Sequence, residues 1–154
     1  MNSDQGKIPE RLQEIVEEFE LCEGREKIEL LLEYAERLPE LPERLCQQHD
    51  EMELVQECMT PVYVQAETES GRMTFHFDVP PESPTVRGFA AIMAEGMHGV
   101  SPQTVLGVPN DFFYAMGLER VLTMQRLNGM AAILAHMKRL AAQMSDAPAL
   151  DAPG

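Results

Sequence analysis

Two kinds of hydrophobic spacing divide this chain into helix-forming and strand-forming parts. In residues 8–19 and 28–38, apolar residues recur every three or four positions, and Gly24 lies between the two runs. This spacing predicts two amphipathic helices, and the short break between them favours packing as a helical hairpin. The sequence Leu-Pro-Glu-Leu-Pro at 38–42 ends the region, because a proline disfavours helix at the residue before it.

The middle of the chain changes to strict alternation of apolar and polar residues. Three such runs predict strands at 51–54, 62–67 and 72–79, with a Glu-Ser-Gly turn joining the last two. In the first run we expect Met52 and Leu54 to form the apolar face. The pattern therefore predicts an antiparallel three-stranded meander with one face available to helices.

Helical spacing returns after Pro80-Pro81 and continues to the end of the chain. We expect a helix at 86–97, a short helix capped by Ser101, a second short one after Asn110 or Asp111, and a long helix capped by Thr123. The order of helices, sheet and helices predicts an α+β fold with the helices packed on one face of the sheet.

The C-terminal segment 145–154 is rich in alanine and proline. We expect it to be a disordered tail, which leaves residues 1–144 as a single domain.

Charge and composition exclude several classes of function. The formal net charge is −14, and most of the acidic excess lies in the first 57 residues. So acidic a surface repels phosphate, which argues against nucleic-acid binding. The acidic residues either form a solvated face or attract a basic partner. No apolar run is long enough to span a membrane, no signal-peptide pattern is present, and the three cysteines fit a reducing compartment. We therefore expect a cytoplasmic protein.

Cys58 is the first candidate for chemistry, since it lies where two predicted strands meet. Pro61 interrupts strand pairing just after it, which favours a loop that a partner can reach. Glu57, its neighbour, opposes ionisation because a nearby negative charge raises the pKa of a thiol. These residues alone leave open whether Cys58 is a nucleophile or an inert packed side chain.

A metal site is the alternative for the remaining cysteines and histidines. Cys46 and His49 are three residues apart, and Cys58 and His76 come near them if the strands pair as expected. Thiolate and imidazole ligands suit zinc or an iron–sulfur cluster. The sequence has no paired Cys-x-x-Cys, however, and Cys22 on the first helix is best explained as a small buried apolar residue.

Five segments, taken in order, resemble the SufE family of sulfur-acceptor proteins over about residues 8–143. Two of them surround the candidate residues: Val-Gln-Glu-Cys-Met-Thr-Pro-Val-Tyr at 55–63 is similar to the family's active-cysteine segment, and Pro-Thr-Val-Arg-Gly at 84–88 is similar to the start of its next helix. The others are Pro-Glu-Arg-Leu-Gln-Glu-Ile-Val at 9–16, Leu-Pro-Glu-Leu-Pro at 38–42, and Leu-Thr-Met-Gln-Arg-Leu-Asn-Gly-Met at 122–130.

The resemblance implies a SufE/IscU-like fold and a role in iron–sulfur cluster assembly. Family members accept persulfide sulfur from a cysteine desulfurase, stimulate that enzyme, and pass the sulfur towards Fe–S scaffold proteins. Cys58 would then be the persulfide acceptor and Arg126 the arginine that meets the desulfurase and stabilises the thiolate, with Arg87 a second candidate for that role. No cofactor is expected on this chain, since pyridoxal phosphate belongs to the desulfurase, and no stand-alone enzymatic activity is expected.

The sequence departs from the family pattern beside the cysteine. Glu57 stands where the family usually has glycine, and Met-Thr-Pro at 59–61 replaces Gln-Ser-x. Glycine takes a positive φ at lower cost than glutamate, so the loop can differ in shape. Two other hypotheses therefore stay open: an IscU-like scaffold that binds metal or a cluster through Cys58, Cys46 and a histidine, and a non-catalytic acidic interaction domain.

Overall fold

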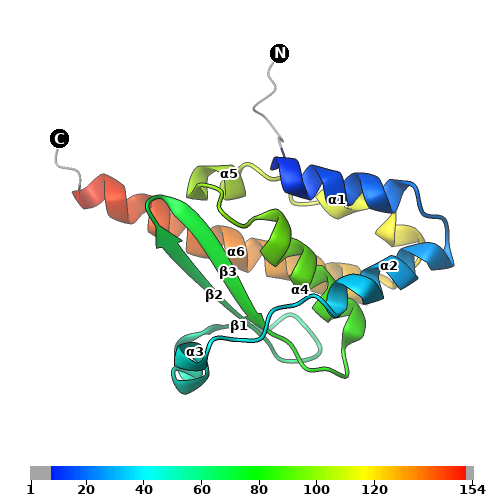
Figure 1. Cartoon of the computed structure of the whole chain (residues 1–154), viewed down its shortest axis with the longest axis horizontal. Coiled ribbons are helices and arrows are strands. Elements are labelled where there is room, and N and C mark those ends of the chain that lie inside the picture. Colours follow the sequence, from blue (N-terminus) through cyan, green and yellow to red (C-terminus); the bar gives the residue numbers. More distant parts are fainter. Residues whose placement is uncertain (1–7, 152–154) are drawn as a thin grey trace, which may run out of the picture.

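A three-stranded antiparallel sheet lies against a layer of helices in the computed structural model, which describes residues 8–151 (Figure 1). The strands are β1 (Glu53–Val55), β2 (Val62–Glu69) and β3 (Arg72–Asp78), in the order β1-β2-β3. Helices α4 (Pro84–Gly96) and α6 (Met124–Asp151) pack against the sheet. The α+β class and the meander predicted from the alternation are confirmed.

The alternation in β2 and β3 places every second side chain in the core. The buried residues are Val62, Val64, Ala66, Met73, Phe75 and Phe77. The residues that alternate with them lie on the opposite face of the sheet and stay partly exposed. Gln65 and His76, for example, are paired across the two strands on that face. Burial of one apolar face against helices is the main favourable contribution to this layer.

Strand β1 has the opposite face inward from the one we expected. Val55 is buried and Leu54 is 37% exposed, because pairing with β2 sets Val55 opposite the buried Val62 and Glu53 opposite the buried Val64. Directly opposed residues share a face of the sheet, so Glu53 points towards α6. The expectation of an apolar face formed by Met52 and Leu54 was wrong for Leu54, whereas Met52, just before the strand, is buried.

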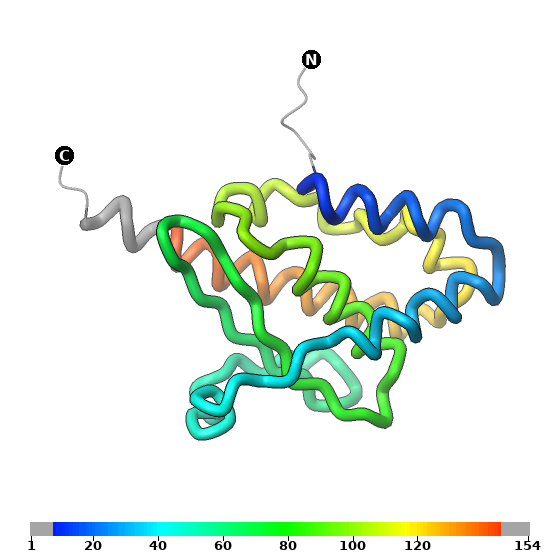
Figure 2. The backbone as a smooth tube through the Cα atoms, viewed as in Figure 1, coloured from blue at the N-terminus to red at the C-terminus, as the bar shows by residue number. Residues whose placement is uncertain are grey.

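The first two helices do not form the closely packed hairpin we expected. α1 (Glu10–Glu20) and α2 (Arg25–Ala35) diverge from the turn at Gly24, and each packs mainly against α4 (Figure 2). Side chains still connect them, since the rings of Phe19 and Tyr34 stack with centroids 6.1 Å apart. The reason is that the buried faces of both helices, which include Leu12 and Leu31, join the core cluster that contains Phe89 of α4.

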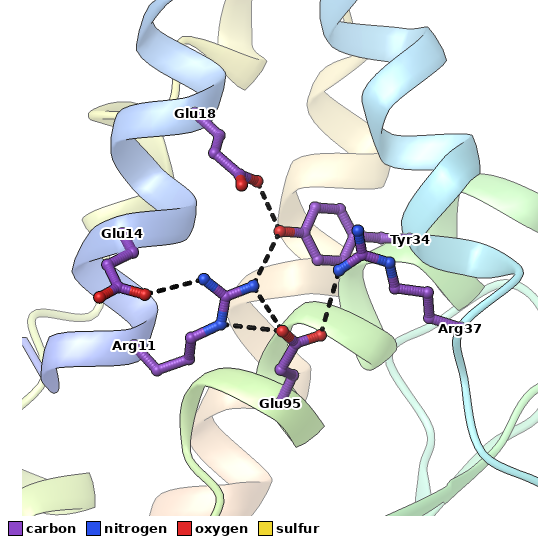
Figure 3. A network of polar contacts seen from close by, with 6 residues as sticks. All are labelled: Arg11, Glu14, Glu18, Tyr34, Arg37 and Glu95. Carbon is purple, nitrogen blue, oxygen red and sulfur yellow. Dashed lines mark hydrogen bonds and ion pairs between the residues drawn. The ribbon is translucent and has the colours of Figure 1, made fainter.

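A polar network joins the outer surfaces of these three helices (Figure 3). Arg11 on α1 donates from Nε to Glu95 on α4 at 2.8 Å, and the Tyr34 hydroxyl on α2 donates to Glu18 at 2.6 Å. Burial, together with the hydrogen bond to Glu18, raises the pKa of Tyr34 to about 12. Arg37 approaches Glu95 at 3.5 Å from the end of α2. The network connects α1 and α2 to each other and to α4.

The remaining helices are all short. They are α3 (Glu43–Gln47), η1 (His49–Glu51), α5 (Pro102–Leu106), η2 (Phe112–Tyr114) and η3 (Leu118–Arg120). Two of the expected caps are confirmed: the Ser101 hydroxyl accepts from the Thr104 amide at 3.1 Å, and the Thr123 hydroxyl accepts from the Arg126 amide at 3.3 Å. Asp111 precedes η2 as expected, but its side chain makes no capping hydrogen bond.

Helix α6 is longer than the sequence suggested. It continues to Asp151, through residues 145–151 that we expected to belong to a disordered tail. Alanine is the strongest helix former, and its abundance there favours continuation of the helix. Residues 152–154 lie outside the described part of the chain.

Candidate functional site

Cys58 lies in the loop 56–61 that connects β1 to β2. Its amide donates to the carbonyl of Val55 at 3.3 Å, which folds the loop back on the end of β1. The side chain is half-buried, and Sγ lies 3.6 Å from the carbonyl oxygen of Gly129 on α6. A Cβ at Gly129 would stand 3.4 Å from Sγ, so the sulfur packs against α6 at this position.

A pocket of about 180 Å³ opens beside this thiol. Three segments line it: the cysteine loop, the start of α4 and the start of α6. The lining residues are Cys58, Met59, Thr60, Glu82, Ser83, Pro84, Thr85, Val86, Gln125, Arg126 and Gly129. Met59 is 74% exposed at this pocket, which leaves apolar surface beside the cysteine.

The structure brings Arg126 to the pocket with Cys58 but leaves Arg87 outside its lining. The guanidinium of Arg126 donates to the Thr85 hydroxyl at 2.9 Å, which ties the first turn of α6 to the first turn of α4. Within residues 8–151, Arg126 makes no ion pair, so its charge is available to an anionic group that enters the pocket. Arg87 instead donates to the carbonyl of Val79 at 2.7 Å, which braces the connection from β3 to α4.

Ionisation of the Cys58 thiol is strongly unfavourable in this structure. Burial raises the pKa of Cys58 to about 11, and the charge of Glu57 adds to the increase, in the direction expected from the sequence. Arg126 is not among the groups that shift this pKa. Since the thiolate is the nucleophilic form, the sulfur is chemically quiet in this conformation.

Sequence reasoning missed a cluster of charged side chains that ties the cysteine loop to α6. His136 Nε2 lies 3.1 Å from Glu57 Oε1, and His136 Nδ1 contacts Glu53 Oε2. Arg139, one turn further along α6, pairs with the same Glu53 carboxylate. A backbone hydrogen bond of its own, helped by His136, lowers the pKa of Glu57. The sequence holds no signal for this cluster, because the expected face of the first strand left Glu53 outward. Only the pairing with β2 turns Glu53 inward, where it requires a cation opposite it.

The residues considered for a metal site do not converge. Cys46 points its thiol at the carbonyl of Leu41 at 3.7 Å, His49 pairs with Asp78 at 2.6 Å, and His76 pairs with Glu67 at 3.0 Å. Among residues 8–151 no three side chains of histidine, cysteine, aspartate or glutamate are grouped so that they could hold a metal ion. In the same range, no helix is both long enough and apolar enough to cross a membrane.

Comparison with known proteins finds relatives that match most of the chain. A family model described as "SufE: Fe-S metabolism associated domain" matches residues 13–141. An uncharacterized SufE-like protein of Mycobacterium tuberculosis is 40% identical over 133 residues, which are 86% of this chain and 92% of that protein. An uncharacterized SufE-like protein of Synechocystis is 30% identical over 132 residues, which are 85% of this chain and 80% of that protein.

A solved structure is also similar. It is the solution structure of a hypothetical protein from Thermus thermophilus, which is 37% identical and superposes with a TM-score of 0.78. The match covers 88% of this chain and 96% of that one. With the family model and the relatives above, it shows that this chain belongs to the SufE family, whose domain is associated with Fe-S metabolism.

Proposed function

We propose that this protein is a sulfur acceptor that takes persulfide sulfur from a cysteine desulfurase and stimulates that enzyme. Cys58 is the acceptor, and the sulfur it receives passes on to Fe–S scaffold proteins. The observation that carries the proposal is the position of the Cys58 thiol, half-buried at an open pocket with Arg126 in the same wall. We expect the protein to act in the cytoplasm, with pyridoxal phosphate held by the desulfurase and not by this chain.

The chemistry is a thiol exchange that needs no external oxidant or reductant. The Cys58 thiolate attacks the terminal sulfur of the donor persulfide, a new S–S bond forms, and the bond between the two donor sulfurs breaks. The donor cysteine leaves as a thiolate and takes up the proton that Cys58 lost. One sulfur atom has then moved, and both proteins keep the same number of thiol protons.

Each part of the pocket has a role in this reaction. Arg126 carries a positive charge that no ion pair neutralises in residues 8–151, and it suits a transition state in which negative charge spreads over three sulfurs. The exposed Met59 offers an apolar contact beside the cysteine to the partner protein. The high pKa of Cys58 fits a thiol that reacts only after the partner has changed its surroundings.

The test is transfer of sulfur from a cysteine desulfurase supplied with cysteine. We expect wild-type protein to gain about 32 Da, the mass of one sulfur, on the peptide that contains Cys58, and to accelerate sulfide release. Cys58→Ser should abolish both effects, and Cys46→Ser is the matched control that should retain both. Arg126→Gln should lower the rate of transfer by about tenfold or more, as loss of one charged donor does in other active sites.

Two results would refute the proposal. If wild type and Cys58→Ser stimulate the desulfurase equally, the chain acts as a non-catalytic acidic interaction domain. If anaerobically purified protein holds one equivalent of zinc or iron that is lost in Cys58→Ser, the scaffold hypothesis replaces the acceptor.

A further inference from the structure

His136 contacts two carboxylates that belong to different parts of the cysteine region. Its Nδ1 faces Glu53 on β1, and its Nε2 lies 3.1 Å from Glu57 in the loop. A neutral imidazole has one N–H and one acceptor nitrogen, so it donates to only one of these groups. The protonated ring donates to both. In either form the ring connects β1 to the cysteine loop, because each of its nitrogens lies against a carboxylate.

The two contacts differ in how well they are protected from water. The side chains of Glu53 and His136 are only 15% and 17% exposed, and Arg139 also pairs with Glu53. Glu57 is 61% exposed. The contact between Glu53 and His136 thus anchors the histidine between β1 and α6, whereas the contact to Glu57 is on the surface and opens more easily.

Glu57 precedes Cys58 directly, so its contact with His136 also restrains the backbone that carries the thiol. While Glu57 is bound to His136, the loop is drawn to α6 and Sγ rests beside the Gly129 carbonyl. When that contact breaks, the loop 56–61 keeps its attachments to β1 and β2 and the weak contact of Cys58 Sγ with the Gly129 carbonyl. Local opening of this kind is the step that exposes a half-buried group without unfolding the domain.

We propose that His136 is a positioning residue for Cys58, acting through Glu57 to hold the cysteine loop closed against α6. Opening of this contact presents the thiol to a reagent or to a protein partner. Its importance for sulfur transfer rests on the function proposed above, but the contact itself exists without any partner.

The first measurement is hydrogen exchange of the backbone amides in the free protein. We expect His136→Gln and Glu57→Gln each to accelerate exchange in the peptide that covers residues 56–61 by about two- to fivefold, the range expected for an exposed ion pair. Arg139→Gln is the matched control, because Arg139 contacts Glu53 but not Glu57. In Arg139→Gln, the amides of residues 56–61 should exchange at the wild-type rate. Amide exchange in β2 and β3 should be unchanged in all three variants.

The second measurement is alkylation of Cys58 by iodoacetamide, followed by mass spectrometry of its peptide across a range of pH. Opening predicts that His136→Gln reacts about two- to fivefold faster than wild type. An electrostatic effect alone predicts the reverse, since loss of the contact with His136 leaves the Glu57 charge less compensated and disfavours the thiolate. Glu57→Gln should react faster and also shift the pH profile to lower pH.

Three outcomes would overturn the proposal: unchanged exchange in residues 56–61 of His136→Gln and Glu57→Gln, alkylation of His136→Gln at or below the wild-type rate, or equal acceleration in Arg139→Gln. If His136→Gln does not fold, Glu57→Gln decides alone, since its side chain is exposed. Neither measurement uses a desulfurase, so the sulfur-acceptor function can fail while this proposal holds, and the reverse.

Discussion

Two glycines on helices should respond in opposite ways to replacement by alanine. At Gly88 on α4, a Cβ would lie 2.2 Å from the carbonyl oxygen of Leu31 on α2. Rotation of a side chain does not relieve a contact with backbone, so α2 and α4 must separate by roughly 1 Å to restore an ordinary contact. At Gly129 on α6, the nearest atom is Cys58 Sγ at 3.4 Å, which is close to normal van der Waals distance.

The magnitudes follow from two opposing effects. Alanine in place of glycine favours a helix by up to about 1 kcal/mol, and this gain is the same at both sites. Overpacking a core costs about 1–3 kcal/mol, and a clash with backbone lies at the upper end. Gly88→Ala should therefore lower the free energy of unfolding by about 2 kcal/mol, whereas Gly129→Ala should leave it unchanged or raise it by up to about 1 kcal/mol.

Thermal and urea unfolding of the two variants, side by side with wild type, provide the test. For a domain of this size, 2 kcal/mol corresponds to a decrease in Tm of about 4–8 °C. The reasoning is refuted if Gly88→Ala is as stable as wild type, or if both variants shift in the same direction by the same amount. A positive result explains Gly88 in the motif 84–88 as a packing residue.

Three further perturbations test the electrostatics and the core. The pKa of Cys58 is about 11 in the folded protein against an ordinary value of 9.0. The contribution of the neutral thiol to folding stability is therefore lost as pH rises from 9.0 towards 11. Wild type should lose about 1 kcal/mol more than Cys58→Ser between pH 8.5 and 10.5 in urea unfolding under reducing conditions, after allowance for partial exposure. The pKa of Glu67 is lowered to about 2, chiefly by its hydrogen bonds from Arg44. Wild type should therefore lose stability relative to Glu67→Gln as pH falls from 4.5 towards 2. Lys27 is buried with Nζ on the Phe19 carbonyl, so Lys27→Ala should cost about 2 kcal/mol by urea unfolding and Lys27→Met less than half of that.

The sheet and the helix starts are predictable from the sequence because local rules determine them. The alternation in 72–79 identifies β3, since one face of a half-buried strand must be apolar along its whole length. Ser101 and Thr123 mark helix starts because their hydroxyls satisfy amides in the first turn that have no partner within the helix.

The face of β1 and the charge cluster behind it are not predictable in the same way. A three-residue strand carries too little alternation to identify its buried side, and its register depends on pairing with β2. The partners of Glu53 lie more than eighty residues away on α6, where His136 and Arg139 are one turn apart. The sequence places Cys58 in a loop, but that loop's contact with α6 is a property of tertiary packing.

The acidity of Cys58 gives the strongest physical reason to expect dependence on a partner. With a pKa of about 11, only about one thiol in ten thousand is ionised at pH 7, roughly a hundredfold less than for a thiol at 9.0. Because exchange proceeds through the thiolate, the isolated protein is a slow acceptor and is correspondingly resistant to stray oxidation. Two changes raise the ionised fraction: relief of burial when the loop opens, and approach of a cation such as Arg126. On the proposed function, a desulfurase that covers the pocket and displaces the loop relieves the burial of the thiol and lets Arg126 approach it. Acceptance of sulfur is then confined to the complex.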